Sequence, residues 1–132
     1  MASKPQSHLR WGRALVAAVA VEIVLVVITA ALFATMADPT QTLDLAIPPA
    51  ALILFIPAGY WTARGTSAPV LNGLVAGLWG IALYVVLTLI AQGAVADFDF
   101  ESSVRPAYLL AHGLKVVGGV IGGWLVARKV SG

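Results

Sequence analysis

The chain has 132 residues, of which 60% are apolar and 11% are charged. A soluble domain has roughly 45–50% apolar and about 25% charged residues, so the composition excludes a water-soluble globular domain. A chain of this length holds one domain at most. The net charge of +2 is mildly basic, and nucleic acid is not an expected partner. The absence of cysteine excludes disulfides, thiolate metal sites and cysteine nucleophiles.

Four apolar stretches are long enough to cross a bilayer, which takes about 20 helical residues because about 30 Å of hydrocarbon is covered at 1.5 Å per residue. They span about 14–37, 45–63, 68–96 and 105–127. The connections are short, so consecutive helices are expected to be antiparallel neighbours. The sequence therefore predicts an all-α polytopic membrane protein: one membrane domain over 1–132, with a disordered tail at 1–9 and an up-and-down four-helix bundle.

The charges of the flanking segments differ in sign between the two sides of this bundle. One side carries only bases, namely Lys4, Arg10, Arg13, Arg64, Arg128 and Lys129. The other carries the acids Asp38, Asp44, Asp97, Asp99 and Glu101, with Arg105 as its only base. Because lysine and arginine mark the cytoplasmic side, both termini are expected inside, with an acidic outer loop at 97–104. The first span exceeds a signal-peptide core of about 7–15 residues, so an uncleaved helix is expected in a bacterial-type inner membrane.

Glycine spacing indicates where helices approach closely, because small residues let backbones touch in lipid. The third span has Gly73, Gly77 and Gly80 on one helical face. The fourth has two overlapping pairs four residues apart: Gly118 with Gly122, and Gly119 with Gly123. The simplest interpretation is a contact between these two spans. A seam between copies of the chain is the alternative.

Prolines make the second span irregular. Pro48 and Pro49 are expected in its first turn, where a missing N–H has no partner to lose, after a segment that is extended. Pro57 removes an internal hydrogen bond and predicts a kink one turn before residues 59–61. Simple packing geometry explains such a kink, and a hinge for transport is the alternative.

Two ionisable residues fall near the middle of the membrane, where each costs about 2.5–3.5 kcal/mol on the lenient insertion scale. Glu22 lies roughly 13 Å and Lys115 roughly 20 Å from the inner rim at 1.5 Å per residue. Their long side chains can span that difference in depth. The sequence therefore predicts a Glu22–Lys115 ion pair between the first and fourth spans.

Lys115 belongs to a polar stripe of the fourth span that includes Tyr108 and His112. With Glu22 these residues form a candidate intramembrane network, to which Thr29, Tyr84, Thr88 and Gln92 could add hydrogen bonds. One interpretation is structural, with the polar groups fixing helix register. Another is proton or ion coupling, because carboxyl, imidazole and amine groups exchange protons. The third is a lipid-modifying enzyme.

Motifs for hydrolase, metalloprotease and nucleotide-binding sites are absent. No cofactor and no metal is expected, and the acids of the outer loop are interpreted as a solvated rim rather than a cation site.

Ala18 and Glu22 in the first of four short spans resemble the small multidrug transporters. The resemblance implies a drug- or ion-coupled role for Glu22. It covers these two residues, whereas the decisive charge bias and Lys115 depart from that family's pattern, so membership is not inferred.

We therefore expect a small non-enzymatic integral membrane protein or accessory subunit, held by a buried polar network and by glycine-mediated helix packing. The bilayer, further copies of the chain or a larger membrane complex are its expected partners. The alternative is a proton-coupled transporter of small solutes or ions that uses Glu22, His112 and Lys115.

Overall fold

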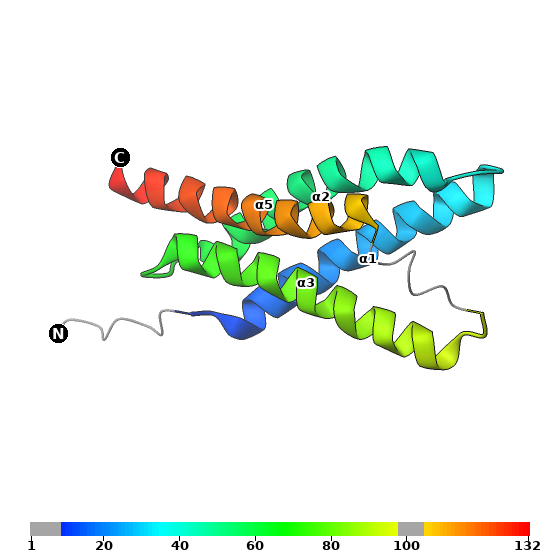
Figure 1. Cartoon of the computed structure of the whole chain (residues 1–132). Coiled ribbons are helices and arrows are strands. Elements are labelled where there is room, and N and C mark those ends of the chain that lie inside the picture. The colour runs from blue at the N-terminus through cyan, green and yellow to red at the C-terminus, as the bar shows by residue number, and fades with distance from the viewer. Residues whose placement is uncertain (1–8, 98–104) are drawn as a thin grey trace.

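The computed structural model describes residues 9–97 and 105–132. Within these residues the chain forms four helices: α1 (Trp11–Thr35), α2 (Thr40–Ala63), α3 (Pro69–Ala94) and α5 (Pro106–Ser131), shown in Figure 1. Each is long and apolar enough to cross a membrane. The predicted class, an all-helical bundle of four candidate membrane spans, is therefore confirmed. Residues 1–8 of the predicted tail and 98–104 of the predicted outer loop lie outside the described residues.

Polar contacts show which helix ends lie together. The backbone N–H of Arg10 donates to Asn72 Oδ1 at 2.7 Å, which ties the segment before α1 to the start of α3. The Arg13 guanidinium donates to the Arg64 carbonyl at 2.9 Å, where α2 ends. Asp44 in α2 and Arg105 just before α5 form an ion pair. In Figure 1 α3 diverges from α1 and α2 toward its own end.

α5 is the helix against which both α2 and α3 pack. It makes the most extensive contacts of any helix, first with α2 and then with α3. α1 packs against α2 and α3 and hardly touches α5. The bundle is therefore tight on two sides of α5 and loose on the side that faces α1.

Glycines allow α5 to approach α3 closely. A Cβ added at Gly77 would lie 2.7 Å from the Lys115 carbonyl oxygen, and one added at Gly123 would lie 2.8 Å from Val70 Cα. Gly73 and Gly119 meet backbone to backbone, so a side chain on either would collide with the other. The glycines of the two spans thus lie against each other within one chain.

The glycines of α5 also contact α2, and the sequence did not predict this contact. A Cβ at Gly118 would lie 2.5 Å from the Leu52 carbonyl oxygen, and one at Gly122 would lie 2.5 Å from the Tyr60 nitrogen. The fully buried ring of Phe55 in α2 reaches across to Gly80 of α3. The candidate packing glycines are therefore occupied inside the monomer, which leaves little of this face for a seam between copies.

The expected start of the second span is wrong. α2 begins at Thr40, about five residues earlier than expected, and Pro48, Pro49 and Pro57 all lie inside it. The start signal is the Asp38–Pro39–Thr40 segment: the Asp38 carboxylate accepts from the Thr40 N–H at 3.3 Å, and the Leu43 N–H donates to the Pro39 carbonyl at 2.9 Å. Packing against the neighbouring helices stabilises α2 by more than the backbone hydrogen bonds lost at its prolines destabilise it. A hinge at Pro57 stays a prediction.

Smaller differences concern the other helix ends. α1 begins at Trp11 rather than near 14, and α5 continues to Ser131 rather than ending near 127. In both cases the additional helical residues include bases, Arg13 in α1 and Arg128 with Lys129 in α5. Composition alone places such charged residues outside an apolar span.

Replacing Gly119 by alanine tests the packing of α5. The added methyl group meets the Gly73 backbone, so we expect a loss of about 1–3 kcal/mol in the free energy of unfolding, as for overpacking in a core. Gly113 on the same helix is the matched control, because a Cβ there meets nothing within 4 Å. Gly113→Ala should leave stability unchanged or raise it by up to about 1 kcal/mol. Equal thermal unfolding of the two variants in detergent would refute the close contact.

Candidate functional site: a polar cavity beside a buried ion pair

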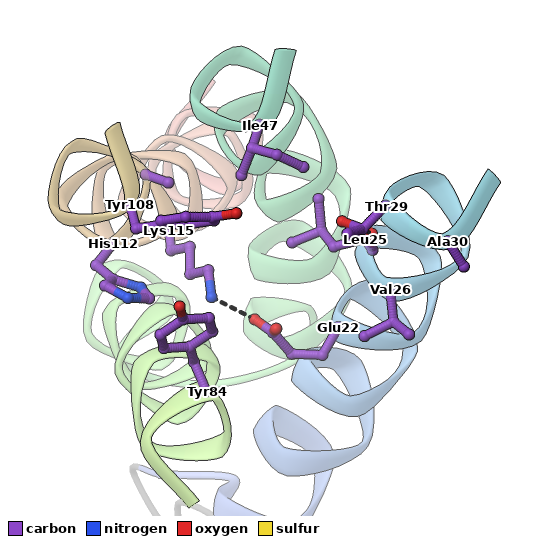
Figure 2. Close-up of a pocket in the computed structure, with 11 residues that line it drawn as sticks. Glu22, Leu25, Val26, Thr29, Ala30, Ile47, Tyr84, Tyr108, His112 and Lys115 are labelled. Carbon is purple, nitrogen blue, oxygen red and sulfur yellow. Dashed lines mark hydrogen bonds and ion pairs between the residues drawn. The ribbon is translucent and has the colours of Figure 1, made fainter. Parts of the chain in front are cut away.

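An ion pair joins α1 to α5 across the loose side of the bundle. Lys115 Nζ lies 2.5 Å from Glu22 Oε1, and the two side chains are only 3% and 8% exposed (Figure 2). Lys115 Nζ also lies 3.4 Å from the Gly80 carbonyl oxygen and 5.2 Å from the centre of the Tyr84 ring. The ammonium is thus surrounded by a carboxylate, a carbonyl and an aromatic face, all of which favour a cation.

Helical periodicity places both charges on buried faces. In α1 the buried positions Ala14, Ala18, Glu22 and Leu25 recur every three or four residues. Lys115 similarly continues the buried face that Ala111 and the packing glycines form on α5. Because removing one partner leaves an uncompensated buried charge, each of these side chains makes the other tolerable at this depth.

A cavity of about 310 Å³ lies beside this ion pair and is lined by residues of all four helices. Its lining residues are Glu22, Leu25, Val26, Thr29, Ala30, Ile47, Tyr84, Tyr108, Ala111, His112 and Lys115. Figure 2 shows Lys115 reaching from α5 toward Glu22, with Tyr84 and His112 beside it. The cavity exists because α1 does not pack on α5 directly, so that the ion pair bridges a gap which larger side chains do not fill.

Three aromatic rings form one wall of the cavity. The rings of Tyr84 and Tyr108 stack with centroids 6.1 Å apart, and the His112 ring lies 4.5 Å from that of Tyr84. His112 Nδ1 is buried and has no hydrogen-bond partner; among the described residues only Trp79 Nε1 shares this condition. A buried polar atom without a partner costs about 1–3 kcal/mol, and a rotation of the His112 ring that turns Nδ1 toward the cavity would let a bound molecule recover this cost.

The structure brings Glu22, Tyr108, His112 and Lys115 together around this one cavity. Of the additional partners suggested by the sequence, Tyr84 and Thr29 line it, although the Thr29 hydroxyl donates to the Leu25 carbonyl of its own helix at 2.9 Å. Thr88 and Gln92 do not line it.

Two features of this site were not predicted from the sequence: a second ion pair, and the part of the cavity wall that α2 contributes. Asp44 and Arg105 pair near the cavity, and Ile47 lines it one turn farther along α2. The signal for the pair was present, because Arg105 is the only base among the acids of its side.

Within 9–97 and 105–132, no group of three His, Asp or Glu side chains is placed to hold a metal ion. Of the three acids in the segment interpreted as a solvated rim, Asp97 is described, whereas Asp99 and Glu101 lie outside the described residues.

Comparison with known proteins gives no match to a family model, a curated protein or a solved structure. Function is therefore inferred from geometry.

A double-mutant cycle on Glu22 and Lys115 tests the ion pair. Each of Glu22→Gln and Lys115→Met leaves one buried charge alone, so each should lower the free energy of unfolding by about 3–5 kcal/mol. The double variant should lose clearly less than the sum, with a coupling of about 0.5–3 kcal/mol. The measurement is thermal unfolding of purified protein in detergent.

The matched control for this cycle is Asp44→Asn with Arg105→Met, at a pair that is about a third exposed. Its coupling should stay below about 1 kcal/mol. Additive losses at Glu22 and Lys115 would contradict the pairing.

Proposed function

We propose that the chain is a non-enzymatic integral membrane protein that acts as a subunit of a membrane assembly, with copies of itself or with a larger complex. The observation that supports this proposal most is the buried Glu22–Lys115 ion pair. Both charges are compensated inside the chain, which is how polar groups that hold a fold together are arranged. A catalytic carboxylate or amine instead needs access to a substrate proton or carbonyl.

The outer surface of α3 is available for association with a partner. Every buried residue of α3 lies between Asn72 and Gly80. In its second half the large apolar side chains are about half exposed, namely Val85, Val86, Leu87, Leu89 and Ile90. Lipid covers such a surface adequately, and a second membrane helix covers it equally well. This half of α3 is therefore the partner surface that we propose.

For topology we propose an up-and-down bundle with both termini on the cytoplasmic side of a bacterial-type inner membrane. The contacts of Arg10 with Asn72 and of Arg13 with Arg64 support this order, because they bring the start of α1 to the α2–α3 connection. The bases of both termini then share one side, as the positive-inside rule requires.

A second candidate function is proton-coupled transport of a small solute or ion. The observation in its favour is that Glu22 and Lys115 line the same cavity as His112, so that a bound solute would reach three groups able to exchange protons. The two candidates differ in whether Glu22 serves stability alone or an ion-dependent activity as well.

Cysteine labelling tests the proposed topology, since the chain has no cysteine of its own. Asp38→Cys and Lys129→Cys both place a thiol at an exposed position, at opposite ends of the bundle. A membrane-impermeant maleimide should label the first in intact cells and the second only after permeabilisation. The reverse pattern, or labelling of both in intact cells, would overturn the proposed orientation.

Flux measurements separate the two functions. Purified protein in liposomes should give no pH-driven proton or solute movement above protein-free liposomes, and Glu22→Gln should lower thermal stability only. Flux that Glu22→Gln abolishes while the unfolding temperature stays unchanged would refute the subunit proposal and support transport.

A further inference from the structure

The cavity beside the ion pair is adjacent to a lipid-facing groove. This groove, of about 340 Å³, runs between α1 and α3 and is lined by Val19, Glu22, Ile23, Val26, Val27, Leu83, Val86 and Leu87. Glu22 and Val26 line both spaces. Val26 and Val86 are 54% and 51% exposed, so the groove opens at the apolar surface of the bundle, toward lipid or toward a partner helix that covers α3. A molecule that extends past Val26 would have one end among polar groups and the other among lipid chains.

The charge of the cavity indicates an uncharged occupant. Glu22 and Lys115 neutralise each other at 2.5 Å. An anion would compete with Glu22 for the ammonium, and a cation would compete with Lys115 for the carboxylate. In either case one buried charge would lose its partner, at a cost of several kcal/mol. A neutral ligand leaves the ion pair intact.

The remaining polar groups indicate what that ligand carries. The phenol of Tyr108 and the imidazole of His112 can donate hydrogen bonds to an acceptor such as a carbonyl oxygen, and His112 Nδ1 is buried without a partner. The stacked rings of Tyr84 and Tyr108 and the tilted His112 ring form an aromatic wall. Planar rings pack well against such a wall. The volume of about 310 Å³ is at the lower limit of small-molecule sites.

We propose that this cavity binds an uncharged amphiphile of the quinone class, with its planar carbonyl-bearing ring beside Tyr84, Tyr108 and His112 and its apolar chain in the groove between α1 and α3. The proposal concerns binding and holds for either candidate function. It makes the bundle a place where a lipid-soluble ring is held near the middle of the membrane.

Equilibrium binding of a decyl-substituted benzoquinone to the chain in nanodiscs tests the proposal, with lipid-only nanodiscs subtracted. We expect saturable binding at one site per chain. Tyr108→Phe and His112→Phe should each weaken binding about 5–10-fold, the effect of one lost hydrogen bond. Tyr60→Phe, on a tyrosine outside the cavity, is the matched control and should bind as the unsubstituted chain does.

A second pair of variants tests the cavity by filling it. Ala30 and Ala31 are both exposed on α1, but only Ala30 lines the cavity, so Ala30→Phe narrows the cavity and Ala31→Phe is its matched control. Binding should be lost in the first and kept in the second, and circular dichroism checks that both are folded. Should Ala30→Phe fail to fold, the Tyr108→Phe result decides.

Three results would overturn the proposal: uptake equal to that of lipid-only nanodiscs, binding that neither Tyr108→Phe nor His112→Phe weakens, and equal affinity for dioctanoylglycerol. The last would show that an apolar chain suffices and that the ring is not recognised.

Discussion

The cost of placing charge in hydrocarbon is the constraint on which this structure depends. Glu22 and Lys115 lie on different helices, 93 positions apart in the chain, and neither is tolerable alone near the middle of a bilayer. Their contact therefore fixes the rotation of α1 and α5 and their relative depth. It also holds α1 near α5 without direct helix packing, and the gap that remains is the polar cavity.

The rest of the bundle complements this loose side with a tight one. Along one half of α5, glycines bring its backbone against both α2 and α3, where van der Waals contact replaces the hydrophobic drive that lipid cannot supply. Beyond Gly80, α3 buries no further residue and diverges from its neighbours (Figure 1). A rigid half and an open half thus meet at the level of the ion pair, where a site can be both accessible from the membrane and firmly positioned.

The sequence predicted those features whose physical cost is visible in composition and period. Lipid excludes unpaired charges and gives no hydrophobic drive for helix association. These two constraints predict the four apolar stretches, the pairing of Glu22 with Lys115 and the glycine faces. The start of α2 could not be predicted in this way, because three prolines argued against a helix that tertiary packing nevertheless stabilises. The contact of α2 with α5 was missed because Gly59, which lies against Gly119, is an isolated glycine. The buried face that it shares with Phe55 does not specify which helix it packs against. The cavity results from how the four helices are placed relative to one another, so the residue pattern of any one helix does not predict it.

The contact of Glu22 with Lys115 inside the membrane is the interaction to measure first. The most direct measurement is the dipolar coupling between a ¹⁵N-labelled lysine Nζ and a ¹³C-labelled glutamate Cδ, recorded by solid-state NMR on protein in bilayers. We expect strong dephasing, consistent with the 2.5 Å contact between Nζ and Oε1, that disappears in Glu22→Gln. No dephasing in the unsubstituted protein, or dephasing that survives in Glu22→Gln, would show that the two side chains do not form this ion pair.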